Sequence, residues 1–280
     1  MKFILSSYKK ILFIVGLMLV LLPNSLSAQQ NKPLNLKNYD NEPYHFGFIL
    51  GYNQMSYAFK YVENYSAIQH DASEYPNTAD PNFNVDAKYY ARSVESKPQP
   101  GFTVGIVGNL RLSRYFDLRL IPSLSFGTRT ITYQLYKQMP IGSSTQSIDF
   151  VQNKSIFSTF VEFPLQVKYK SKRLNNIAGY VIAGGNLKFD LASQKKAQVD
   201  VTDAQTGKQI TVVDNIKVKK SDLALEIGAG FDFYNAYFKL GLEIKMSFGM
   251  LNILDSQNLI YDSSIESLKN KTLQVSLTFE

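Results

Sequence analysis

The sequence predicts an all-β fold, an eight-stranded antiparallel up-and-down transmembrane β-barrel with long extracellular loops. Three observations predict it: an N-terminal export signal, side chains that alternate between apolar and polar along eight long segments, and connections that alternate between short and long. The composition agrees, because 18 Tyr and 19 Phe favour strands, and Tyr also suits a membrane–water boundary.

The first of these observations is a secretory signal peptide, predicted over residues 1–28. Lys9 and Lys10 precede an apolar run over residues 11–23, and small residues follow it up to Ala28. A permanent helical anchor is the weaker alternative, because the run is short for a bilayer span.

Composition excludes several classes of function. The chain has no cysteine, which excludes disulfides, thiol catalysis, Cys-based zinc sites and a lipid anchor on cysteine. Removing the signal lysines Lys2, Lys9 and Lys10 lowers the net charge from +7 to +4, and no basic helix accompanies it, so no nucleic-acid partner is expected. No second apolar run of about 18 residues follows, so a membrane location requires a barrel.

Period-2 alternation marks the strands, and it is clearest after Tyr115. There Phe116 and Leu118 alternate with Asp117 and Arg119. Each segment is long enough to cross a bilayer at a tilt, which takes about 9–11 residues, and bacterial barrels have an even number of strands. The expected strands cover about residues 44–59, 101–113, 115–133, 156–170, 177–191, 221–234, 236–249 and 272–280.

The connections alternate in length along the chain. Tight turns are expected near Arg114, at residues 171–176 and at residues 234–236, whereas long loops are expected at about 60–100, 130–155, 192–219 and 250–271. Outer-membrane barrels place short turns in the periplasm and long loops outside the cell. Strand parity then puts both termini in the periplasm. Residues 29–43 are predicted to form a periplasmic N-terminal segment and residues 44–280 the barrel.

The polar face of each strand is expected to point into the lumen. An eight-stranded barrel is just wide enough inside for side chains to fill, and an unpaired buried charge is costly. The charges should therefore pair, which predicts a plugged structural barrel and not a diffusion pore. The predicted lumen charges are Arg111, Arg119, Glu162, Lys168, Glu226, Asp232, Lys239, Glu243 and Lys245.

Few residues offer catalytic chemistry. His70 lies in the first long loop beside Asp71 and near Ser73, which leaves an outer-membrane hydrolase as an alternative. No nucleophile motif accompanies it, so no enzyme and no catalytic residue is expected. His45 is expected to be an interfacial or capping residue. The Asp-containing stretch at residues 77–86 lacks the EF-hand spacing, so neither a metal nor a cofactor is expected.

Three segments together resemble the PorT/SprT proteins of the Bacteroidetes. Residues 35–55 resemble the mature start of those proteins, and residues 252–280 resemble their C-terminus. Residues 160–170, around Glu162 and Pro164, resemble a strand of the wider PorT-like barrel family. The closing strand, which carries Phe279 next to the terminus, resembles the insertion signal read by the barrel-assembly machinery.

The resemblance implies an integral accessory component of the type IX secretion system, which exports proteins across the outer membrane and supports gliding in some species. It supplies no catalytic residues. The expected partners are outer-membrane lipid, other type IX secretion components and, during biogenesis, the barrel-assembly machinery. The long loops or residues 29–43 would contact the other components. A small porin- or adhesin-type barrel is the first alternative, and the hydrolase is the second.

Overall fold

The computed structural model describes residues 33–75, 82–141, 144–192, 198–202, 209–213, 216–256 and 259–280. The predicted signal peptide lies outside the described residues, as do residues 29–32 of the predicted periplasmic segment and residues 77–81 of the Asp-containing stretch. Residues 35–280 form one compact unit, which contains the barrel.

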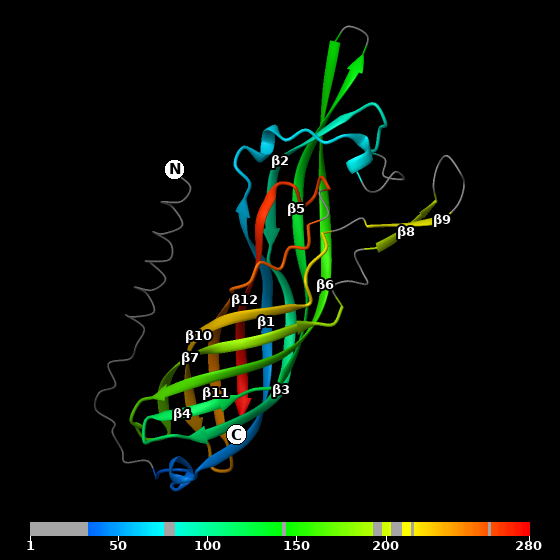
Figure 1. The fold of residues 1–280 in the computed structure, drawn as a ribbon. Coiled ribbons are helices and arrows are strands. Elements are labelled where there is room, and N and C mark those ends of the chain that lie inside the picture. Colours follow the sequence, from blue (N-terminus) through cyan, green and yellow to red (C-terminus); the bar gives the residue numbers. More distant parts are fainter. Residues whose placement is uncertain are drawn as a thin grey trace. The chain divides into compact units, whose positions relative to one another are not determined.

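Eight antiparallel strands form a closed ring, as predicted (Figure 1). In chain order the ring strands are β1 (Tyr44–Tyr61), β3 (Gln99–Arg111), β4 (Phe116–Leu120) with β5 (Ser123–Ile141), β6 (Ser144–Lys170), β7 (Ile177–Asp190), β10 (Ser221–Tyr234), β11 (Lys239–Gly249) and β12 (Ile265–Phe279). β4 and β5 act as one strand interrupted at Pro122, because both pair with β3 on one side and β6 on the other. The pairing of β1 with both β3 and β12 closes the ring.

The remaining elements lie outside this ring. The 3-10 helix η1 (Tyr39–Asn41) precedes β1. Two further 3-10 helices, η2 (Tyr65–Ala67) and η3 (Ala72–Glu74), and β2 (Lys88–Lys97) lie between β1 and β3. β8 (Gln198–Thr202) and β9 (Gln209–Val213) pair as a separate hairpin. No helix in the described residues is long and apolar enough to cross a membrane.

The expected long loops contain regular structure, and the prediction of a loop over residues 130–155 is wrong. β5 and β6 continue there as a paired hairpin up to Ile141 and Ser144. The strand continuation is hidden in the sequence because the apolar positions change parity. Leu124 and Phe126 are the apolar residues in the ring, whereas Ile131 and Tyr133 are apolar beyond it.

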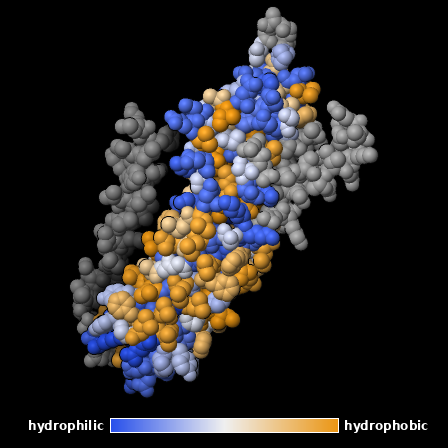
Figure 2. Space-filling view, in the orientation of Figure 1, coloured by the Kyte–Doolittle hydropathy of each residue, from blue (hydrophilic) through white to orange (hydrophobic). Residues whose placement is uncertain are grey.

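The outer face of the ring is apolar. Large side chains at alternate positions are exposed there, including Phe48, Phe102, Ile106, Leu165 and Ile227. Figure 2 shows an apolar band on one face of the molecule, with polar residues at both of its ends. Such a band is the surface that a transmembrane barrel presents to lipid.

The main hydrophobic core lies beyond one end of the ring. We call the end near Tyr44 and Phe279 the terminal end and the opposite end the loop end. The described parts of residues 59–97, 130–156, 216–219 and 250–268 form a cap at the loop end. Their buried side chains make one cluster, which includes Tyr75, Tyr89, Val94, Ile131, Tyr133, Leu135, Ile156, Ile216, Val218, Ile253, Ile260, Tyr261 and Leu268.

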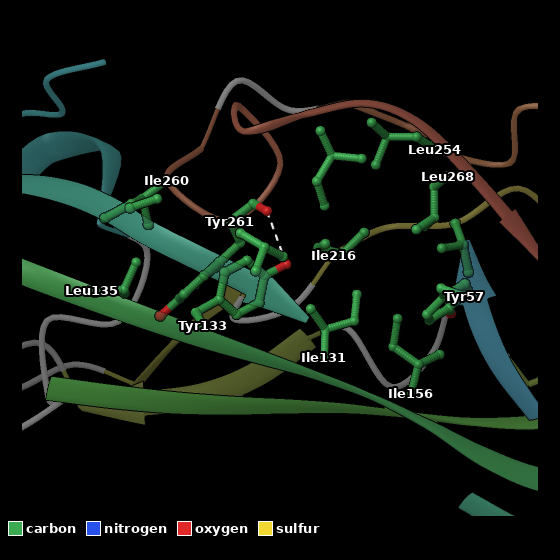
Figure 3. Close-up of a cluster of buried hydrophobic side chains, with 14 of the residues drawn as sticks. Tyr57, Ile131, Tyr133, Leu135, Ile156, Ile216, Leu254, Ile260, Tyr261 and Leu268 are labelled. Carbon is green, nitrogen blue, oxygen red and sulfur yellow. Dashed lines mark hydrogen bonds between the residues drawn. The ribbon is translucent and has the colours of Figure 1, made fainter. Parts of the chain in front are cut away.

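Each of the four long connections contributes to this cluster. Figure 3 shows members from the second, third and fourth connections, such as Ile131, Ile216 and Tyr261. The hydroxyl of Tyr133 donates to the carbonyl of Tyr261 at 2.9 Å, which joins the second connection to the fourth. The connections therefore fold together as one unit over the ring, instead of projecting as separate loops.

Candidate functional site

Charged side chains that point inward fill the lumen of the ring with ion pairs. Arg119 of β4 and Glu243 of β11 stand on opposite sides of the ring, and Nη1 of the arginine donates to Oε2 of the glutamate at 2.7 Å. Both side chains are fully buried. Lys168 of β6 donates to Asp232 of β10, also at 2.7 Å. Each partner supplies the counter-charge that makes burial of the other tolerable.

Further predicted lumen charges pair in the same space. Nζ of Lys245 lies 3.0 Å from Oε2 of Glu226, and Nζ of Lys188 lies 3.5 Å from Oε1 of Glu162. The amide of Asn186 donates to both glutamates, at 2.8 Å to Glu226 and 3.0 Å to Glu162. These pairs therefore belong to one hydrogen-bonded network and not to separate contacts.

Two of the predicted lumen charges lie at the terminal end. Lys239 pairs at 2.8 Å with Glu280, the last residue, whose side chain is fully buried. Arg111 lies at the partly exposed rim, where its Nη1 donates to the carbonyl of Asn41 at 2.9 Å. It makes no ion pair with another described residue. Arg111 is the last residue of β3, so its inward direction takes it to the mouth of the ring, where solvent can reach it.

The lumen also contains charges that the sequence analysis did not select. Strand parity would have found Asp117 and Lys188, because both occupy inward positions of alternating segments. Glu280 follows the last strand, and only the closure of the ring brings it to Lys239. The buried charges missed in the ring are Asp117, Arg129, Lys170, Lys188, Asp190, Asp222 and Glu280.

Arg129 separates the charged lumen from the apolar cap. Its Nη2 donates to Asp190 at 2.7 Å, and the side chain is almost completely buried. The guanidinium lies 4.8 Å from the ring centroid of Tyr57 and 4.9 Å from that of Phe160, and it also bonds Asn270. A planar cation satisfies both environments, because its edges bond polar groups while its faces contact aromatic rings.

Residues 35–42 cover the terminal end of the ring. The ring of Tyr39 stacks on His45 with centroids 3.6 Å apart, and its hydroxyl donates to Glu280 at 3.3 Å. Burial raises the pKa of Tyr39, so its hydroxyl stays protonated and able to donate. The hydroxyl of Tyr234 donates to Asp40 at 2.8 Å. A cavity of about 10 Å³ remains here, enough for about one water molecule.

His45 and His70 both have well-defined partners. Nε2 of His45 lies 2.9 Å from the carbonyl of Tyr39, so this ring holds η1 against β1. His70 is buried in the cap, with Nδ1 2.6 Å from Oε2 of Glu74 and Nε2 2.9 Å from Oγ of Ser263. The sequence suggested Asp71 or Ser73 as neighbours of His70, but Ser263 comes from the fourth connection. Among the described residues, no group of three or more His, Asp or Glu side chains could hold a metal ion.

A comparison with protein families agrees with this architecture. A family model described as "Outer membrane protein beta-barrel domain" matches residues 27–255. Neisserial surface protein A (NspA) is similar in structure, with a TM-score of 0.38 and 10% sequence identity over 85% of this chain and 98% of that chain.

Two further solved structures are similar at the same level. OprG of Pseudomonas aeruginosa has a TM-score of 0.38 and 9% identity, covering 85% of this chain and 94% of its own. Ail, the attachment invasion locus protein of Yersinia pestis, has a TM-score of 0.32 and 10% identity, covering 85% of this chain and 98% of its own. No curated protein sequence matches the chain.

Proposed function

The chain belongs to the outer membrane protein β-barrel domain family, and from this premise we propose that it acts in the outer membrane as a closed barrel that binds partners through its cap. The observation that carries the proposal is the filled lumen. Buried ion pairs such as Arg119–Glu243 occupy it, Arg129 lies under the cap, and residues 35–42 cover the other end.

A filled lumen opposes a transport function. A permeant ion would have to separate buried charge pairs, and loss of one partner of such a pair typically costs about 3–5 kcal/mol. The test is conductance of the purified mature protein in planar bilayers. We expect no stable open channels. Stable channels in the wild-type protein would overturn the closed-barrel proposal and favour a porin.

The outer surface of the cap offers a binding patch of suitable chemistry. The rings of Tyr90 on β2 and Tyr136 on β5 stack with centroids 4.9 Å apart, and the exposed guanidinium of Arg92 lies 5.3 Å from the Tyr136 centroid. Tyr and Arg are among the residues that are enriched in binding hot spots. An adhesin-type role would use this patch.

The patch can be tested on bacteria that display the protein. We expect the double variant Arg92→Ala and Tyr136→Ala to reduce cell attachment, because truncation of a hot-spot residue typically costs about 2 kcal/mol or more of binding. The control is Gln134→Ala, an exposed residue two positions from Tyr136. Attachment that depends on the protein but is equal in all three strains would remove the patch from the proposal.

An accessory role in type IX secretion is the second candidate. It rests on the resemblance of residues 35–55 and 252–280 to the PorT/SprT proteins. These segments lie side by side, because β1 pairs with β12 from Phe48 with Phe279 to Tyr61 with Ile265. The resemblance therefore describes one continuous part of the barrel wall, where other secretion components would bind.

Deletion of the gene tests the secretion role. We expect loss of type IX cargo from the medium and, in gliding species, loss of gliding. Normal secretion in the deletion strain would remove this candidate.

The barrel-assembly machinery is a proposed partner of Phe279, whose ring stacks on Phe48 with centroids 4.9 Å apart. A Phe279→Ala variant should accumulate outside the membrane fraction.

We also propose that the chain has no enzymatic activity and that His70 is structural. Its contacts with Glu74 and Ser263 join the first connection to the fourth, and its backbone pairs with Tyr89. A buried histidine with both ring nitrogens engaged stabilises the cap without any substrate.

A further inference from the structure

A strongly basic pocket lies at the rim of the terminal end. Its volume is about 270 Å³, and Asp40 is the carboxylate among its lining side chains. The cations that line it lie at the ends of β3 and β6 and in the turns that follow these two strands. They are Arg111, Arg114, Lys170, Lys172 and Arg173.

The carboxylates nearby do not neutralise these cations. Nζ of Lys170 lies 3.1 Å from Asp117 and 3.6 Å from Asp40, so both carboxylates form ion pairs with this one lysine. Arg173 lies 4.0 Å from Asp40 and donates mainly to backbone carbonyls. Arg114 and Lys172 are exposed, and neither pairs with a carboxylate among the described residues. The pocket therefore keeps a net positive charge that favours an anion.

An apolar groove on the outer face of the ring begins at the same place. Its volume is about 530 Å³, and Ser171 lines both the groove and the basic pocket. The groove exists because Gly179 has no side chain beside Phe231, whose ring atoms lie 3.6 Å from where a Cβ would stand. From Ser171 it extends along exposed apolar residues that include Val181, Ile244 and Val275.

We propose that the pocket and the groove together bind one anionic phospholipid of the periplasmic leaflet. The phosphate occupies the basic pocket, where Arg and Lys side chains form charge-assisted hydrogen bonds with it. An acyl chain lies in the apolar groove, which faces the bilayer. A free phosphate ion would leave the groove unused, and a zwitterionic lipid such as phosphatidylcholine would bring a trimethylammonium group that the cations of the pocket repel. The site depends on the outer-membrane location and on the predicted orientation, but not on any function of the cap.

Native mass spectrometry of the full mature protein in detergent tests the site. The probes are phosphatidylglycerol, phosphatidylcholine with the same acyl chains, and inorganic phosphate. We expect a one-to-one complex with phosphatidylglycerol at least about tenfold tighter than with phosphatidylcholine, and no complex with phosphate. Equal affinity for the two lipids would overturn the proposal, and binding of phosphate as tight as that of phosphatidylglycerol would reduce the site to an ion site.

Charge variants test the pocket. We expect Arg114→Gln with Lys172→Gln to weaken phosphatidylglycerol binding about fivefold for each cation removed, with phosphatidylcholine unaffected. The matched control is Lys60→Gln with Lys271→Gln, which removes the same charge from exposed positions at the loop end. Wild-type binding in the rim variant would overturn the role of the pocket.

A matched pair of glycine variants tests the groove. Gly179→Val places a side chain in the groove with only ordinary contacts, so the fold should be kept. Gly185→Val is the control, because Gly185 lies on the same strand and the same outer face, with its nearest atom 4.0 Å from an added Cβ. We expect Gly179→Val, but not Gly185→Val, to weaken the binding of both lipids several-fold. Equal binding in the two variants, with folding verified by heat-dependent gel mobility, would remove the groove from the site.

Discussion

The ring and the cap are built from the same strands with opposite polarity. In the ring, the outward residues of β5 are apolar, such as Leu124 and Phe126, and the inward residues are polar, such as Ser123 and Ser125. In the cap, the same strand turns Ile131 inward, where it is fully buried. The backbone alternation does not change, so the reversal reflects a change of surroundings from lipid to water.

The reversal occurs at one level of the molecule. Gly127 pairs with Gly101 and Ser158 at the last level of the charged lumen, and Arg129 pairs with Ile156 at the first level of the apolar core. On β1 the outward side chains change from Tyr52 to Gln54 near this level. The level at which the polarity reverses therefore predicts where the bilayer ends. The ring and the cap can each be disrupted by separate substitutions.

The largest effect is expected in the lumen. Glu243→Gln removes the counter-charge of the fully buried Arg119 and weakens an acceptor of Tyr180, whose hydroxyl donates to Glu243 at 3.1 Å. We expect the free energy of unfolding to fall by about 3–5 kcal/mol. Urea titration in lipid vesicles, followed by far-ultraviolet circular dichroism, measures it, because the chain has no Trp for fluorescence.

The control for this prediction removes both charges. The double variant Arg119→Leu and Glu243→Leu should be more stable than Glu243→Gln, since an apolar pair leaves no unpaired charge. If Glu243→Gln were as stable as the wild type, the lumen would be hydrated, and the closed-barrel proposal would weaken with it.

The sequence was sufficient to predict the ring, because alternation and loop lengths are local properties. For the same reason it assigned Arg119, Glu162 and Lys168 to inward positions, where the structure has them buried, but it did not select others such as Lys188 and Glu280. It could not predict the cap, because residues such as Tyr133 and Tyr261 meet only after the ring closes. The apolar positions also change parity within β5. In the sequence, this continuous strand therefore looks like a strand followed by a loop.

The second effect concerns the core of the cap. Ile131→Ala should lower the free energy of unfolding by about 2–5 kcal/mol, because the side chain is fully buried and its truncation leaves a cavity. We expect hydrogen exchange to accelerate in β2 and in the extension of β5, while the ring strands keep their protection. Leu124→Ala is the control, since Leu124 faces outward in the ring. Global unfolding by Ile131→Ala would show that the cap and ring are one cooperative unit.

A charge on the outer face distinguishes the regions directly. Ile106→Arg, at a position that is 63% exposed on the apolar band, should cost about 2–4 kcal/mol in a bilayer. Gln134→Arg, exposed on the cap, should change stability by less than about 0.5 kcal/mol. Urea titration in vesicles compares them. Equal costs would mean that the apolar band is not the lipid-facing surface.

The smallest effect concerns the contacts of His70 in the cap. Ser263→Ala removes one hydrogen bond to Nε2 of His70 and should lower the stability of the cap by about 1 kcal/mol, measured as faster hydrogen exchange around η3 and the fourth connection.

The geometry around His70 allows a different interpretation. In the tautomer whose Nδ1–H donates to Glu74, Nε2 accepts from the Ser263 hydroxyl, which is the arrangement of a serine hydrolase triad. Wild-type protein should therefore be assayed on p-nitrophenyl esters beside Ser263→Ala and His70→Ala. We expect no hydrolysis above the blank in any of them, whereas hydrolysis by the wild type that both variants abolish would make the cap an active site.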